Sequence, residues 1–160
     1  MMLAELNNAP PETARRALSA CCGSGAWVER MISMRPFGDS SWLHDAAQIT
    51  WISLPASDWL EAFSKHPKIG ETSPSSWSRQ EQQSMSNATA LTAASIRELN
   101  EQYFTKFGWI FIICATGKSA DEMHSALQQR LHNDADTELP IAAAEQARIM
   151  HLRLDKLLSA

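Results

Sequence analysis

Helix start and stop signals recur along the whole chain, and they constrain its fold more than any other feature of the sequence. Pro11 suits the first turn of a helix, and Gly108 suits the left-handed residue that ends one. Ser119 and Glu122 have the spacing of a capping box. The breaks between apolar stretches hold Pro, Gly and Ser instead of the Asn-Gly turns of β-hairpins. The sequence therefore predicts an all-α fold, a compact single-domain bundle of about eight helices over residues 1–160.

The predicted helices are separated by short breaks. They cover residues 11–22, 26–34, 40–54, 58–65, 89–107, 119–132 and 138–158, and a further helix starts at residue 78. Residues 66–70 break the helical pattern, and residues 71–77 have the composition of an exposed loop. The apolar run 109–115 fits a short strand, but without a partner strand a buried helical or extended segment is favoured. Pro140 is expected in the first turn of the last helix.

Composition and charge limit the partners of the chain. Its 160 residues are 44% hydrophobic and 20% charged, which is the mixture of one ordinary soluble domain. No apolar run reaches the roughly 18 residues of a membrane helix, and residues 1–10 lack the basic start and apolar middle of a secretion signal. The net charge of −4, without a Lys or Arg run, argues against nucleic-acid binding. We expect a small-molecule partner, no nucleic acid and no membrane.

The cysteines and histidines argue against disulfides and metal ions. Adjacent Cys21 and Cys22 and the distant Cys114 provide neither a disulfide framework nor CxxC spacing, so a reducing, cytoplasmic location is expected. The histidines include no pair at the i, i+4 spacing of an HExxH helix, so no metal site is expected. These histidines are His44, His66, His124, His132 and His151.

Residues 115–119, Ala-Thr-Gly-Lys-Ser, follow an apolar run as a phosphate-binding loop does. Such a loop needs a glycine five positions before Gly117, so that backbone amides wrap the phosphate, but Ile112 stands there. The pattern therefore predicts an ordinary loop whose Ser119 caps the next helix.

Two local patterns have both a structural and a chemical interpretation. His66 precedes Pro67 at the end of a predicted helix, so its backbone is extended and its side chain projects from a bend. It is either a terminator whose positive form complements the helix dipole or a reactive group. Ser78 and Glu81 form either a capping box or a helix start that also binds an anion, and these two roles are not exclusive.

A series of short motifs follows in a fixed order from one end of the chain to the other. The motifs are Leu6-Asn7, Cys22 with Ser24 and Trp27, Arg35-Pro36-Phe37, Asp58 to Phe63, His66-Pro67-Lys68-Ile69-Gly70, Ser78-Arg79-Gln80-Glu81-Gln82, Asn100-x-x-Tyr103-x-x-Lys106-Phe107-Gly108, Phe111 to Ala115 and Arg153-Leu154. Each motif is weak alone, but their order and spacing are specific. Together they resemble the 2-oxo-4-hydroxy-4-carboxy-5-ureidoimidazoline decarboxylase family of urate breakdown, shortened to OHCU decarboxylase.

The resemblance implies a compact all-helical protein, often a homodimer, that uses no metal and no organic cofactor. It implies that His66 is the catalytic proton donor and that Glu81 accepts hydrogen bonds from the substrate while it keeps His66 protonated. It further implies a set of substrate-binding residues. These are Pro67, Ser78, Gln82, Phe111, Ile112, Ile113, Cys114, Ala115 and Arg153.

The implied reaction is decarboxylation of the ureidoimidazoline to (S)-allantoin by a carboxy-lyase. Loss of carbon dioxide leaves electron density that the neighbouring ring carbonyl accepts as an enolate, so no electron-sink cofactor is needed. Backbone amides of residues 111–115 would stabilise the oxyanion, and Arg153 would bind a carboxylate or ureido oxygen. His66 would then protonate one face and fix the handedness of the product.

The alternative is a non-enzymatic helical interaction module whose tryptophans bind another protein. Most of the tryptophans stand at apolar helical positions, so we expect them in the core and not on a binding surface. They are Trp27, Trp42, Trp51, Trp59, Trp77 and Trp109.

Overall fold

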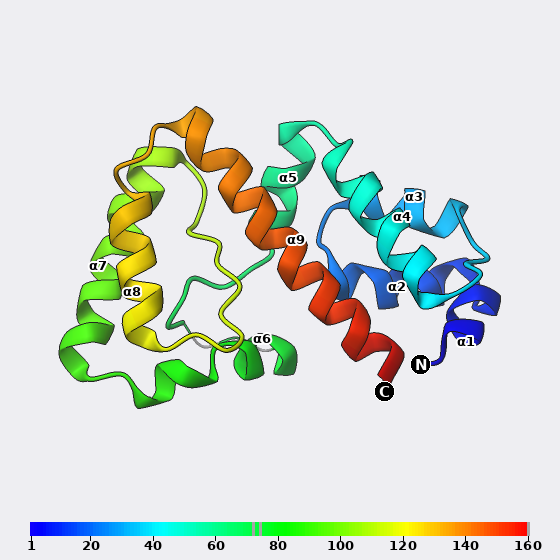
Figure 1. Cartoon of the computed structure of the whole chain (residues 1–160), viewed down its shortest axis with the longest axis horizontal. Helices are drawn as coiled ribbons and strands as arrows, with labels where there is room; N and C mark the ends of the chain where they lie inside the picture. Colours follow the sequence, from blue (N-terminus) through cyan, green and yellow to red (C-terminus); the bar gives the residue numbers. More distant parts are fainter. Residues whose placement is uncertain (72, 74, 160) are drawn as a thin grey trace. The chain divides into compact units, whose positions relative to one another are not determined.

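Helices account for all the regular secondary structure in the computed structural model, which describes residues 1–71, 73 and 75–159 (Figure 1). The helices are α1 (Leu3–Asn8), α2 (Pro11–Cys21), α3 (Gly25–Ser33), α4 (Ser40–Ile52), α5 (Ala56–Phe63), α6 (Ser76–Glu81), the 3-10 helix η1 (Gln83–Asn87), α7 (Ala90–Phe107), α8 (Ala120–Arg130) and α9 (Ala135–Ser159). No strand occurs among the described residues. The predicted all-α fold is therefore confirmed.

The local capping signals place several helix ends correctly. Ser119 forms the predicted capping box with Glu122 at the start of α8. Gly108 ends α7 in the left-handed conformation with φ 82°, which favours glycine because it has no Cβ. At α3 the sequence predicted a start at residue 26 without naming a cap. The helix begins at Gly25, and Ser24 caps it by accepting a hydrogen bond from the Trp27 amide at 3.3 Å.

Several helices differ from the prediction. Helix α5 covers Ala56–Phe63 instead of residues 58–65, and η1 was not predicted. The short helix α1 was not predicted, since six residues are too few to show a periodic pattern. The helix predicted to start at Ser78 begins at Ser76, because Ser75 is the residue whose side chain accepts from the Ser78 amide. Helix α9 starts at Ala135 instead of residue 138, so Pro140 lies inside the helix and not in its first turn.

The chain divides into two compact units, which we call unit 1 (Met1–Ala62 and Ala147–Ala160) and unit 2 (Phe63–Gln146). Unit 1 holds α1 to α5 and the second part of α9. Unit 2 holds α6, η1, α7, α8 and the first part of α9, together with Phe63, the last residue of α5.

In unit 1, helix α3 packs against both α2 and α4. The core is apolar, and its fully buried side chains include Leu6, Leu18, Trp27, Met31, Leu43, Trp51 and Met150. The indole N–H of Trp27 donates to the Ala47 carbonyl at 3.1 Å, so the ring is buried without losing its hydrogen bond. The prediction that the tryptophans lie in the core holds for Trp27 and Trp51 but is wrong for Trp42, which is 49% exposed on α4.

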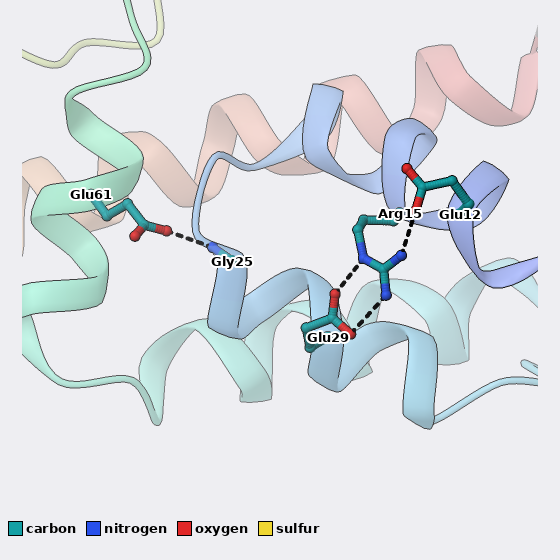
Figure 2. A network of polar contacts seen from close by, with 5 residues as sticks. All are labelled: Glu12, Arg15, Gly25, Glu29 and Glu61. Carbon is teal, nitrogen blue, oxygen red and sulfur yellow. Dashed lines mark hydrogen bonds and ion pairs between the residues drawn. The ribbon is translucent and has the colours of Figure 1, made fainter.

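Figure 2 shows a network of polar contacts in unit 1. Arg15 on α2 binds Glu12 at 2.7 Å and Glu29 at 2.6 Å, and all three side chains are largely exposed. In the same view the Glu61 carboxylate accepts a hydrogen bond at 2.6 Å from the amide of Gly25, the first residue of α3. A carboxylate at this end of a helix complements the helix dipole.

In unit 2, helices α7 and α8 lie side by side (Figure 1) and enclose an apolar cluster. The cluster consists of Ile69, Ile96, Tyr103, Phe107, Phe111, Ile113, Ala115, Met123 and Leu127. Residues 109–115, which connect α7 to α8, run without helix through this core, and residues 111–115 are all buried. Of the two forms favoured for this run, the extended one is therefore present.

Candidate active site

His66 follows the end of α5 in a turn, as its position before Pro67 predicts. Its amide donates to the Phe63 carbonyl at 3.2 Å, and both His66 and Pro67 are half-buried. The imidazole Nε2 lies 2.6 Å from Oε1 of Gln146 on α9. Gln146 was not among the predicted site residues, because a glutamine within a helix carries no sequence signal that separates it from a surface residue.

Residues 68–70, which follow His66, are anchored from two sides within unit 2. The side-chain amide of Asn100 on α7 donates to the Ile69 carbonyl at 3.0 Å. The Gly70 amide donates to Oε1 of Gln82 at 2.9 Å. Gly70 has φ 90°, a backbone conformation that strains other residues. The predicted substrate residue Gln82 thus has an observed contact that fixes the backbone beyond His66.

The segment Ser78 to Gln82 does not form the helix start that the sequence predicted. Ser78 is buried inside α6, and Glu81 is the last residue of that helix. The proposed capping box between Ser78 and Glu81 is therefore wrong, because Ser75 provides the cap one turn earlier. Glu81 is half-buried at the end of α6.

The extended segment 111–115 is held by two cationic side chains. Nη1 of Arg130 donates to the Ile112 carbonyl at 2.7 Å, and Nζ of Lys118 donates to the Cys114 carbonyl at 2.9 Å. Since the C=O and N–H of one peptide unit point in opposite directions, these bonds direct the N–H groups of Ile113 and Ala115 away from the two cations.

The backbone amides of this segment have no acceptor in the part of the chain that the structure describes. No described residue accepts a hydrogen bond from the N–H groups of residues 111–115. Buried backbone N–H groups are nearly always paired with protein or water. A row of unpaired donors is the arrangement that an oxyanion-binding segment needs.

A buried polar network holds Arg130 in place. Glu138, which is fully buried, accepts from Nε of Arg130 at 2.6 Å, from the Tyr103 hydroxyl at 2.7 Å and from Asn133 at 3.0 Å. Burial, followed by the hydrogen bond to Glu138, raises the pKa of Tyr103 well above its usual range, so Tyr103 stays a neutral donor. The network connects α7, α8 and α9 to the carbonyl of Ile112.

Glu81 and Ala115 line one open depression of about 560 Å³ in unit 2. Its other lining residues are Gln80, Gln83, Ser84, Asn87, Thr116, Gly117, Lys118, Ser119 and Glu122. Two predicted site residues that are far apart in the sequence therefore share one surface. Lys118 and Ser119, which the sequence assigned to an ordinary loop, lie on the rim of the same depression.

Comparison with known proteins agrees with the motifs. The sequence model of the OHCU decarboxylase family matches residues 7–155. The chain belongs to this family.

Individual members of the OHCU decarboxylase family and related proteins are similar over most of this chain. A uric acid degradation bifunctional protein of Arabidopsis thaliana is 42% identical over 87% of this chain and 45% of its own length. A uric acid degradation bifunctional protein of Bacillus subtilis is 29% identical over 94% of this chain and 31% of its own length. The chain thus spans less than half of each of these relatives. A crystal structure of OHCU decarboxylase in the presence of (S)-allantoin superposes with a TM-score of 0.80 at 39% identity, covering 89% of this chain and 96% of the other.

Arg153, the remaining predicted site residue of this OHCU decarboxylase family member, lies in unit 1. It is buried on α9, and its Nη1 donates to the Ala20 carbonyl at 3.3 Å. The charge of Arg153 lowers the pKa of Cys21 and of Cys22, but burial has the larger effect and raises both pKa values to about 12, so these thiols are neutral. Its role at a substrate remains a prediction.

Two features of the described residues concern metals and membranes. No three His, Cys, Asp or Glu side chains among them are grouped so that they hold a metal ion. None of the described helices is long and apolar enough to cross a membrane.

Proposed function

We propose that this chain decarboxylates 2-oxo-4-hydroxy-4-carboxy-5-ureidoimidazoline to (S)-allantoin in urate degradation. The observation that carries the proposal is the family match over residues 7–155, which includes the motifs at His66 and Glu81. The structural relative with (S)-allantoin gives the expected product. We also propose that residues 1–160 work as one catalytic domain, since the match is continuous across both units.

In the proposed reaction the bond between the ring carbon and the carboxylate breaks, and carbon dioxide leaves. The electron pair of that bond moves into the unsaturated ring, where the unpaired amides of residues 111–115 stabilise the developing negative charge. A protonated His66 then gives its proton to the adjacent ring carbon, which carries the ureido group. The ring hydroxyl releases its proton and becomes the carbonyl of allantoin, and solvent restores the proton to the imidazole. Glu81 accepts hydrogen bonds from N–H groups of the substrate. Arg153 enters the proposal through the family resemblance alone, as a fork for an oxygen of the substrate.

The remaining substrate contacts are proposed from the same resemblance. Pro67, Ser78 and Gln82 would shape the pocket beside His66 and Glu81, and the side chains of Phe111, Ile112, Ile113, Cys114 and Ala115 fix the segment whose amides bind the charge. No metal or organic cofactor takes part, because the ring of the substrate itself accepts the electron pair.

The assembly and the location of the protein are further parts of the proposal. We propose a homodimer, which the family resemblance implies. Trp42, Ile49 and Ile52 on α4 are 49%, 64% and 60% exposed and offer an apolar face for such contacts. A reducing location such as the cytoplasm agrees with the free thiols of Cys21, Cys22 and Cys114. Sedimentation equilibrium of the wild type and of Ile49→Lys measures the dimer directly.

The experiment that tests the reaction follows both the rate and the handedness of the product. Urate is freshly oxidised to the ureidoimidazoline, and circular dichroism records the allantoin formed with and without the protein. The uncatalysed reaction has no reason to favour one face, so it gives a racemate, whereas a donor fixed on one side gives a single hand. We expect faster loss of substrate and a strong (S)-allantoin signal.

Two outcomes would contradict the proposal. Loss of substrate at the uncatalysed rate would leave the alternative of a non-enzymatic interaction module. Faster loss with a racemic product would mean that solvent, and not a fixed side chain, supplies the proton.

A further inference from the structure

Gln146 contacts the His66 ring within unit 2. Its side chain is fully buried, and its Oε1 lies 2.6 Å from Nε2 of His66. The contact joins residues 80 positions apart, from the turn after α5 and from α9. A carboxamide is uncharged at any physiological pH. Its hydrogen bond with His66 therefore changes only when His66 itself gains or loses a proton.

The buried carboxamide is not explained by packing. An amide in a protein interior needs hydrogen bonds at both its oxygen and its nitrogen. In the described part of the chain the Nε2 of Gln146 has no hydrogen-bond partner, although the atom is buried. An apolar residue of similar length, such as methionine, would fill the same space at a lower cost. The hydrogen bond that the described residues give the Gln146 carboxamide is the one between its Oε1 and His66.

The chemistry of the two atoms fixes the position of a hydrogen. In the orientation that the structure gives the Gln146 carboxamide, its oxygen faces the ring and only accepts hydrogen bonds, so the Nε2 of His66 carries a hydrogen in this contact. A neutral imidazole has one N–H, and a hydrogen held on Nε2 leaves Nδ1 as the ring atom that gains and loses the second proton.

We propose that Gln146 is a positioning residue of the decarboxylation, which keeps a hydrogen on Nε2 of His66 and so leaves Nδ1 as the ring atom that takes up and releases the second proton. This inference rests on the proposed function for its catalytic part. The tautomer of His66 is a property of the free protein and is measured without substrate.

The test is a set of variants studied by NMR of the imidazole nitrogens and by kinetics. In the wild type at a pH where His66 is neutral, we expect the hydrogen on Nε2. Gln146→Met keeps the length of the side chain but removes the acceptor, so it should give a mixture of the two tautomers. Turnover in Gln146→Met should fall by up to about 10²-fold, as expected for a misplaced catalytic group, with a change mainly in kcat and not in KM.

A conservative variant and a matched control make the test specific. Gln146→Glu retains an acceptor oxygen, so it should restore the hydrogen on Nε2 and recover turnover relative to Gln146→Met. In unit 1 Gln48 makes a similar contact, with its Oε1 2.9 Å from Nε2 of His151. Gln48→Met should change the signals of His151 and leave both the His66 tautomer and the turnover as in the wild type.

The proposal is overturned if the neutral His66 of the wild type carries its hydrogen on Nδ1, or if Gln146→Met leaves the tautomer population unchanged. If the wild type carries the hydrogen on Nε2 but does not accelerate the decarboxylation, the proposed function is wrong. The effect of Gln146 on the His66 tautomer would still be confirmed. Failure of the two ideas is therefore distinguishable.

Discussion

Unit 2 buries more polar side chains than unit 1, where the buried polar side chains include Ser24, Thr50 and Arg153. The core of unit 1 is built from apolar side chains on α2, α3 and α4, and its Arg15 to Glu29 pair is exposed to solvent (Figure 2). Unit 2 buries the Arg130 to Glu138 pair, whose side chains are 10% and 0% exposed. Its interior also holds polar atoms without a hydrogen-bond partner in the described part of the chain, among them Ser84 Oγ, Asn100 Oδ1 and Gln146 Nε2.

The two units differ in what their buried side chains do. In unit 1 they are mainly apolar and stabilise the fold, and in unit 2 a buried polar network holds the backbone of the proposed site. Each large apolar side chain that is fully buried in unit 1 contributes roughly 1.5 to 3 kcal/mol. In unit 2 the buried pair fixes the carbonyl of Ile112, and a buried pair of this kind adds little net stability because both charges lose water. The polar groups of unit 2 instead hold the backbone amides of residues 111–115 in place and, in our proposal, keep a hydrogen on Nε2 of His66.

The largest effect is expected from the proposed proton donor His66 and from Glu81, which both lie in unit 2. His66→Asn and Glu81→Gln in unit 2 should each reduce turnover, His66→Asn by about 10² to 10⁴-fold, since a proton donor supplies a factor of this size. The matched variants in unit 1, His44→Asn and Glu29→Gln, should leave turnover within experimental error. Initial rates on fresh substrate, with far-ultraviolet circular dichroism as the control for folding, measure this.

If His66→Asn retained nearly full activity, the assignment of the chemistry to unit 2 would be wrong. If His44→Asn lowered turnover as much as His66→Asn, the loss in His66→Asn would not be specific to the proposed proton donor.

The two ion pairs provide a second contrast. Arg130→Met removes one partner of a buried pair and leaves Glu138 as an unpaired buried charge, so it should lower the free energy of unfolding by about 3 to 5 kcal/mol. Arg15→Met removes an exposed partner of Glu12 and Glu29, and its effect should be too small to resolve. Urea unfolding of both variants at the same pH gives the comparison.

Glu138→Gln is a useful third variant in that experiment, since it removes the buried negative charge but keeps an acceptor for Tyr103. Glu138→Gln should lower the free energy of unfolding less than Arg130→Met does. Equal losses for Arg130→Met and Arg15→Met would mean that burial does not distinguish the two pairs.

The smallest effect concerns the pH dependence of stability in unit 1. Burial, followed by the nearby His44, lowers the pKa of His151 in the folded protein. In the unfolded chain a histidine titrates near pH 6.5, so the unfolded state binds more protons between that pH and the lower folded pKa. The His151 contribution is therefore present above about pH 6.5 and is lost as the pH falls below it.

His151→Gln should flatten this part of the pH dependence, which is measured by urea unfolding between about pH 5 and 8. A variant whose stability falls as steeply as that of the wild type would show that other groups cause the acid sensitivity. A stability that rises as the pH falls in the wild type would contradict the direction of the pKa change.

Local sequence determined most of the helices of this protein. The ends of α3, α7 and α8 are set by Ser24, Gly108 and Ser119. A cap joins residues three or four positions apart, so its stabilisation depends on local sequence alone. The start of α6 was predicted wrongly at Ser78, because Ser75, Ser76 and Ser78 are chemically equal as caps and the choice among them depends on what the helix packs against.

The sequence also pointed to His66, Glu81 and the run Phe111 to Ala115 as chemically important, although it did not fix the conformation of that run. The run is apolar throughout, so neither a helical nor an alternating pattern distinguishes the forms. Its extended form depends on Arg130 and Lys118, which bind its carbonyls, and Arg130 is 18 residues from Ile112.

Only the tertiary structure could show the role of Gln146. In the sequence it is one polar residue of a long helix, and nothing in its neighbours distinguishes it from a solvent-exposed position. The fold buries it and places its amide against His66, 80 residues earlier. The physical reason is that helix formation depends on nearby residues, whereas the protonation of a histidine depends on whichever atoms the fold brings within hydrogen-bonding distance of its ring.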